Sequence, residues 1–214
     1  WSDGGGGGGA LLSVDASPDG LQLASCGEGG LLSLHDAEGG ERLDIPTEES
    51  CLFSAEWCSP NEVLTAGACV SLWDKRDLRR PTSRLLPSFG TPMSCSPQLQ
   101  AASRHPQHPH RVAAGASSGA LYGWDLRLGG GRASDLGAHG GDVWCVAYAQ
   151  LALGDLLSCS SDGTLVARAE EGTASQVLVA LEQPINSFHV SPLHGGLAAA
   201  SDAEVLTFID LRAT

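Results

Sequence analysis

The sequence predicts an all-β fold made of repeated antiparallel units, and two observations support this prediction. Glycine accounts for 28 of the 214 residues, roughly twice the average usage, which favours many tight turns and short strands. Five similar apolar strands also recur along the chain, and they end at His35, Trp73, Trp124, Arg168 and Ile209. Their spacings are 38, 51, 44 and 41 residues, which is the period of one blade of a β-propeller.

Each unit contains three strands in the same order. An apolar strand such as "VWCVAYA" comes first, and a turn that often contains proline follows it. The second strand is rich in small residues, as in "RVAAGAS", and a turn bearing Gly or Asp leads to the third. Short β-runs separated by such turns are typical of β-meanders. We expect the small-residue strand to lie near the crowded central axis, so that "GASSGALYGWDLR" (115–127) forms the inner half of a blade.

The repeat predicts one domain, a β-propeller over residues 11–214. Its five blades cover approximately residues 11–50, 51–90, 91–134, 135–180 and 181–214. Residues 1–10 hold a run of six glycines, Gly4 to Gly9, which we expect to be a flexible linker. The chain begins at Trp1 without an initiator methionine, so we expect an incomplete N-terminus that retains a remnant of an earlier blade.

Charge and hydropathy exclude several classes of function. Twenty-five Asp and Glu residues against twelve Lys and Arg give a formal net charge of −13, which disfavours direct contact with nucleic acid or anionic membranes. Neither a signal peptide nor a run of 18 apolar residues is present in the sequence, so we expect a soluble, intracellular protein without membrane insertion. Seven cysteines form no CxxC pair, and buried thiols in a reducing compartment explain them better than disulfides or zinc.

The third strands resemble the WD40 repeat. Trp73-Asp74 and Trp124-Asp125, the second followed by Arg127, match its Trp-Asp dipeptide, and Asp210 ends the last such strand. In the fourth unit the resemblance implies that His139, Ser158 or Ser160, and Asp162 form a hydrogen-bonded chain tying the strands together, while Arg168 takes the place of the tryptophan. A buried imidazole of this kind has to be fully hydrogen-bonded or it destabilises the blade.

Two sets of side chains could instead carry chemistry. His139, Ser158 and Asp162 contain the residue types of a catalytic triad, but no GxSxG elbow precedes a helix, and catalysis would need a concave pocket joining them. His105, His108 and His110 in "RHPQHPH" could ligate zinc or nickel. No carboxylate or cysteine completes that pattern, and two prolines mark an exposed connection between strands. We therefore expect no catalytic residue, no metal and no cofactor.

An ordered set of segments is more specific than the repeat itself. "RHP", "WDLR", "AH" and "LLSCSSDGTL" occur in this sequence and separation at the junction of the third and fourth units, and "SDAEVLTFIDL" lies in the last unit. Together they resemble the C-terminal blades of the forty-three-kilodalton β-propeller nucleoporins of the Y-shaped nuclear pore subcomplex. The resemblance covers roughly Leu11 to Arg212 and implies a seven-bladed WD40 ring, of which five blades are recognisable here.

The resemblance also implies a function. These nucleoporins are structural scaffolds of the pore's outer ring, at the nuclear envelope, and support nucleocytoplasmic transport of protein and mRNA. They dock on other nucleoporins of the Y complex, and the resemblance implies an α-solenoid subunit of its short arm as the partner of this chain. They are not enzymes. Another intracellular WD40 adaptor, such as a targeting-signal receptor or an assembly factor, remains an alternative, as does an enzyme built on a propeller.

Overall fold

A computed structural model describes residues 9–87, 97–129, 131–149, 156–169, 175–191 and 196–210. In these ranges the strands form five antiparallel sheets, and in each of them the strands pair in chain order. The expected linker up to Gly8 and the expected blade remnant at Trp1 to Asp3 lie outside the described residues, as does Cys95. The predicted all-β propeller architecture is confirmed.

Four sheets contain four strands each, and the fifth contains three described strands. The first sheet comprises β1 (Leu11–Ala16), β2 (Gln22–Gly27), β3 (Leu31–Asp36) and β4 (Arg42–Pro46). The second comprises β5 (Ser54–Ser59), β6 (Glu62–Ala66), β7 (Val70–Asp74) and β8 (Ser83–Leu85). The third comprises β9 (Leu99–Arg104), β10 (Arg111–Ala116), β11 (Ala120–Asp125) and β12 (Ser134–Ala138). The fourth comprises β13 (Val143–Tyr148), β14 (Leu156–Ser160), β15 (Thr164–Arg168) and β16 (Ser175–Ala180), and the fifth comprises β17 (Ile185–Val190), β18 (Gly196–Ser201) and β19 (Leu206–Asp210).

The helical element of the described ranges is a short 3-10 helix, η2 (Leu126–Leu128), directly after β11. It ends at Gly129, whose φ of 69° lies in the left-handed region that glycine adopts without strain. No helix in that part of the chain is long and apolar enough to cross a membrane.

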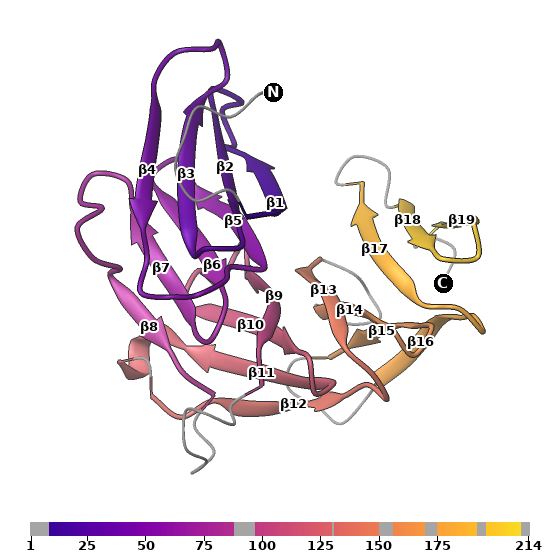
Figure 1. Ribbon diagram of the computed structural model, residues 1–214. Helices are drawn as coiled ribbons and strands as arrows, with labels where there is room; N and C mark the ends of the chain where they lie inside the picture. Colours follow the sequence, from indigo (N-terminus) through magenta and orange to yellow (C-terminus); the bar gives the residue numbers. More distant parts are fainter. Residues whose placement is uncertain are drawn as a thin grey trace.

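The sheets are arranged as an arc of blades (Figure 1). The first strands β1, β5, β9, β13 and β17 lie on the inside, and each contacts the first strand of the next blade. The fourth strands lie on the outer rim. The arc is open between β1 and the last blade, and at these two ends apolar side chains such as Val14 on β1 and Phe208 on β19 are exposed.

The radial position predicted for the second strands was wrong. The first strand, not the small-residue strand, lies innermost, and residues 115–127 form the end of β10, β11 and η2, in the middle of the third blade. Small residues serve a different purpose there. A Cβ atom on Gly115 would lie 2.3 Å from Val143 Cγ1 on the first strand of the next blade. The second strand is therefore small because the neighbouring blade packs directly on it.

The hydrophobic core lies between the blades. One cluster joins the first and second blades, around Leu32, Trp57 and Trp73, and another joins the second and third blades. Two further clusters fill the next two junctions, and Leu121 with Val146 and Leu157 with Phe188 belong to them. Each blade is thus held mainly by burying its faces against its neighbours.

The six cysteines within the described ranges are free thiols. Cys26, Cys69 and Cys159 are buried, Cys51, Cys58 and Cys145 are half-buried, and none of these six forms a disulfide. Burial raises the pKa of the Cys26 thiol to about 12, so this sulfur stays protonated and unreactive at neutral pH.

Candidate functional site

Strand register makes the five third-strand residues structurally equivalent. Each pairs with the same position of the second strand: His35 with Leu23, Trp73 with Val63, Trp124 with Val112, Arg168 with Leu156 and Ile209 with Leu197. Side chains two residues apart on a strand share one face. The residue two positions further along the second strand therefore lies on the same face as the third-strand residue. In blade order it is Ser25, Thr65, Ala114, Ser158 and Ala199.

In the first two blades this pair is joined by a hydrogen bond. The Trp73 Nε1–H donates to Thr65 Oγ1 over 3.1 Å, and both side chains are buried. In the first blade His35 Nε2 lies 2.9 Å from Ser25 Oγ. A smaller ring therefore makes the equivalent contact where the tryptophan is absent.

The third blade has no hydroxyl at this position, because Ala114 replaces the serine or threonine. The Trp124 Nε1–H instead donates to the carbonyl of Leu86, 3.3 Å away, just after β8 of the preceding blade. The indole is 4% exposed and packs beside Tyr122, with a ring-centroid distance of 6.1 Å. Trp124 thus links two blades through both packing and a hydrogen bond.

The fourth blade brings together His139, Ser158 and Asp162. His139 Nε2 lies 2.8 Å from Ser158 Oγ, and its Nδ1 lies 2.9 Å from Thr164 Oγ1 and 3.4 Å from an Asp162 oxygen. Asp162 also accepts from the backbone N–H groups of Gly140 and Thr164. Burial lowers the pKa of His139, and the Asp162 carboxylate only partly opposes this. Ser160 lies beside the cluster, where its hydroxyl accepts from the Asp162 N–H.

Arg168 occupies the tryptophan position of this blade, but not all of its hydrogen-bond donors find a partner among the described residues. Its Nη2 donates to the Ala138 carbonyl over 3.2 Å, but its Nε is buried without a hydrogen-bond partner among the described residues. Burial also lowers the pKa of this guanidinium. Sequence alignment of the units placed Arg168 here, but it could not show that one donor is left unsatisfied.

The aspartates that end the third strands hydrogen-bond to the turn that follows. Arg76 and Arg127 each form an ion pair with the aspartate two residues earlier. The closest N–O distance is 2.5 Å, both to Asp74 and to Asp125. These arginines hold the pKa values of both aspartates at about 2. Asp210 ends β19 opposite Gly196, and Arg212 lies outside the described residues.

The histidine loop is only partly exposed. His108 is exposed, as the prolines predicted, but His105 is buried, and its Nδ1 accepts from the N–H groups of Gln107 and His108. The prediction of an exposed connection was therefore wrong for His105, because this ring holds the turn together. No group of three or more His, Cys, Asp or Glu side chains suited to a metal occurs in the described ranges.

A set of polar side chains on the inner strands was not predicted from the sequence. An oxygen of Asp15 accepts from the Trp57 N–H (2.7 Å), Glu56 accepts from the Arg104 N–H (3.2 Å), and Ser103 accepts from the Tyr148 N–H (3.3 Å). In each case a first strand uses a side chain to bind the backbone of the next first strand. The signal in the sequence is a polar residue between apolar ones within the first two of these strands, in "VDA" and "AEW".

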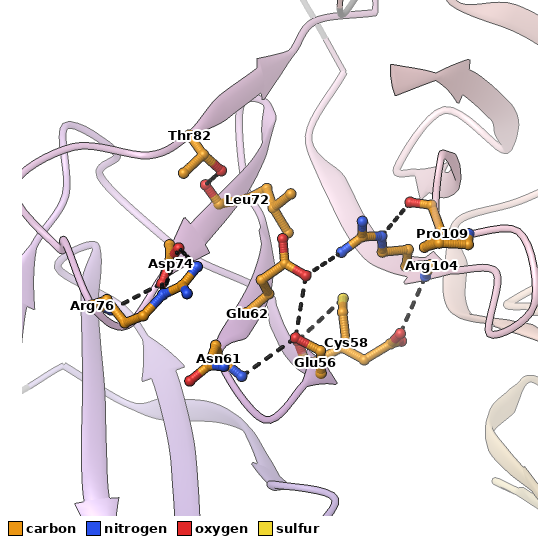
Figure 2. Close-up of polar contacts among 11 residues, drawn as sticks. Glu56, Cys58, Asn61, Glu62, Leu72, Asp74, Arg76, Thr82, Arg104 and Pro109 are labelled. Carbon is orange, nitrogen blue, oxygen red and sulfur yellow. Dashed lines mark hydrogen bonds and ion pairs between the residues drawn. The ribbon is translucent and has the colours of Figure 1, made fainter. Parts of the chain in front are cut away.

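The junction at Glu56 contains further polar contacts (Figure 2). Arg104 Nη1 lies 2.9 Å from Glu62 Oε2, and Arg104 Nε donates to the Pro109 carbonyl. Burial raises the pKa of Glu56 to about 8, although hydrogen bonds from the Arg104 N–H and Ser103 favour the carboxylate. The side chain is thus mainly protonated at neutral pH.

Glu56→Gln is expected to remove a loss of folding stability that the parent chain shows as the pH rises from neutral to alkaline. The pKa of Glu56 is higher in the folded chain than in the unfolded chain, so its contribution to stability is full below about pH 4.5 and is lost as the pH rises through 8. Between pH 7 and pH 9 this loss amounts to about 1 kcal/mol. Urea unfolding at both pH values measures it. Glu41→Gln, at an exposed carboxylate, is the control, and an unchanged pH slope in Glu56→Gln would contradict the assignment.

These features define the class of protein. Successive antiparallel blades, packed face to face and bearing Trp-Asp third strands, make the chain a WD40 β-propeller protein. No protein-family model matches the chain.

Curated relatives narrow the class. Human nucleoporin Nup43 is 30% identical over 150 residues, which is 67% of this chain and 38% of the human protein. The nuclear pore complex protein NUP43 of Arabidopsis thaliana is 28% identical over 157 residues, 64% of this chain and 43% of that protein. The ribosome biogenesis protein WDR12 homolog of Chlamydomonas reinhardtii is 29% identical over 189 residues, 72% of this chain and 40% of that protein.

The matches to Nup43 confirm the resemblance to the forty-three-kilodalton nucleoporins. The matched region spans about two fifths of the length of these relatives.

Proposed function

We propose that this chain is part of a structural scaffold subunit of the nuclear pore complex outer ring. It docks on other nucleoporins of the Y complex, including an α-solenoid subunit of the short arm, and so supports transport of protein and mRNA at the nuclear envelope. The observation that carries this proposal is the 30% identity to human Nup43 over 67% of the chain. The propeller supports it, because blades buried against one another form a stiff body with exposed rims for partners.

We also propose that the signature residues have a structural role and that the protein is not an enzyme. His139 and Ser158 are within hydrogen-bond distance, as in a nucleophile and its base, but the His139 side chain is 1% exposed and Ser158 is 0% exposed. A substrate therefore has no access to either atom. Satisfying buried polar groups is worth about 1–3 kcal/mol for each group, which accounts for the cluster without catalysis.

Localisation and affinity capture of the tagged chain test the scaffold role. The expected result is a punctate nuclear rim, with nucleoporins enriched over a control that carries the tag alone. Diffuse staining without nucleoporins would contradict the proposal.

The second candidate is a WD40 adaptor of another assembly. It is favoured by the 29% identity to the WDR12 homolog, which extends over 72% of the chain. Recovery of ribosome assembly factors from nucleoli in place of nucleoporins would select it.

A further inference from the structure

A surface pocket lies at the outer rim, where the first two blades meet. Its lining includes Pro46 at the end of β4, Glu49 in the following loop, Trp73 on β7, Arg80 and Pro81 in the β7–β8 connection, and Arg84 on β8. The cavity volume is about 90 Å³. Small-molecule and cofactor sites usually measure about 300–1,000 Å³, so this pocket suits a single amino-acid side chain.

The pocket is apolar on one side. Trp73 is 5% exposed, and its Nε1–H is already bonded to Thr65. It therefore offers only ring carbon atoms to an occupant, and Pro46 and Pro81 add aliphatic surface beside it. An aliphatic side chain such as leucine fits this lining, whereas a polar side chain would lose its hydration without gaining a partner from the indole.

The pocket lining carries three arginines, Arg79, Arg80 and Arg84, against two glutamates, Glu48 and Glu49, so it is slightly positive. Five of the twelve basic residues of the chain fall within ten positions: Lys75, Arg76, Arg79, Arg80 and Arg84. The chain as a whole carries a formal charge of −13. An acidic segment is thus repelled by the molecule in general and attracted to this stretch.

The arginines differ in their availability. Arg84 is engaged by Glu48 and by Glu49, whose side chain is 8% exposed. Arg79 pairs with Asp77, but both side chains are well exposed, and exposed ion pairs contribute little to stability. Arg80 is exposed and has no hydrogen bond or ion pair with any of the described residues. Arg80 can therefore bind a ligand without giving up a contact among the described residues, whereas Arg79 would give up an exposed ion pair.

We propose that this pocket docks a short acidic segment of a partner protein. One aliphatic side chain of the segment enters the pocket against Trp73 and Pro81, and carboxylates on either side of it pair with Arg79 and Arg80. Nucleic acid fits less well, because its continuous phosphate charge meets the surrounding acidic surface. The inference rests on the proposed scaffold role and names one docking surface for it.

Fluorescence anisotropy with the purified chain tests the proposal. The probe is a labelled ten-residue peptide with one central leucine flanked by glutamates. Arg79→Glu combined with Arg80→Glu is expected to weaken binding at least tenfold. Replacing the probe's leucine by glycine or its glutamates by glutamine is expected to weaken binding as well. The matched control is Arg132→Glu, which reverses the charge of an exposed arginine in the equivalent connection of the third blade, and it should bind like the parent chain.

Two results would overturn the proposal. Unchanged binding by the double variant would remove the pocket as the site, and equal weakening by Arg132→Glu would mean that only overall charge matters. Circular dichroism of each variant confirms that its fold is retained. Because this assay needs neither the pore nor a cell, its failure is distinguishable from a failure of the proposed localisation.

Discussion

Trp124→Ala is expected to lower the free energy of unfolding by about 3–5 kcal/mol, the usual cost of removing a large buried aromatic side chain. The indole is 4% exposed in the cluster that joins the second and third blades. The substitution would open a cavity there and leave the Leu86 carbonyl without its donor. Urea unfolding monitored by circular dichroism measures the change.

The control for Trp124 is Leu128→Ala, only four residues away. Leu128 is 76% exposed, so its removal should change stability by less than about 0.5 kcal/mol. Binding to a partner should fall in Trp124→Ala only as far as unfolding explains. If the unfolding midpoint stayed unchanged while partner binding disappeared, Trp124 would be a contact residue and its structural assignment would be wrong.

Blade number and strand order were predictable because they depend on local pattern. Each of the first three strands of a unit has its own composition, and the turns between them carry Gly, Pro or Asp, so the period appeared directly in the sequence. The fourth strands were not picked out individually. Segments such as "RLDIP" on β4 and "SRL" on β8 are short, and most of their residues are exposed or half-buried, so they lack the apolar signature of a buried strand.

Contacts between blades were less predictable, because they join residues far apart in the sequence, such as Glu56 and Arg104, which are 48 positions apart. The pairing of Glu56 with the Arg104 N–H depends on how two first strands lie side by side, and composition does not encode that arrangement. The bond between His35 and Ser25 was missed for a different reason. The units were aligned on their third strands, but only strand register shows which second-strand side chain lies on the same face as His35.

Gly115→Ala is the second substitution with a large expected effect, and it tests why the second strands are small. An added Cβ would lie 2.3 Å from Val143 Cγ1 and 2.7 Å from Val143 Cβ, well inside van der Waals contact. Overpacking of this kind costs about 1–3 kcal/mol. Replacing glycine by alanine also restricts the unfolded chain and by itself stabilises by about 0.4–1 kcal/mol. The clash is the larger effect, so we expect a net loss of stability.

Gly196→Ala provides the matched comparison, because Gly196 lies on the second strand of the last blade, which has no described blade beyond it. The nearest atom to its added Cβ is the Ile209 carbonyl oxygen at 3.9 Å, an ordinary contact. Without a clash the entropic gain remains, so this variant should be unchanged or slightly more stable. Opposite signs for the two substitutions in urea unfolding would show that the neighbouring blade, rather than the strand itself, requires the small residue. Equal effects would show instead that the glycines serve the backbone conformation of each strand.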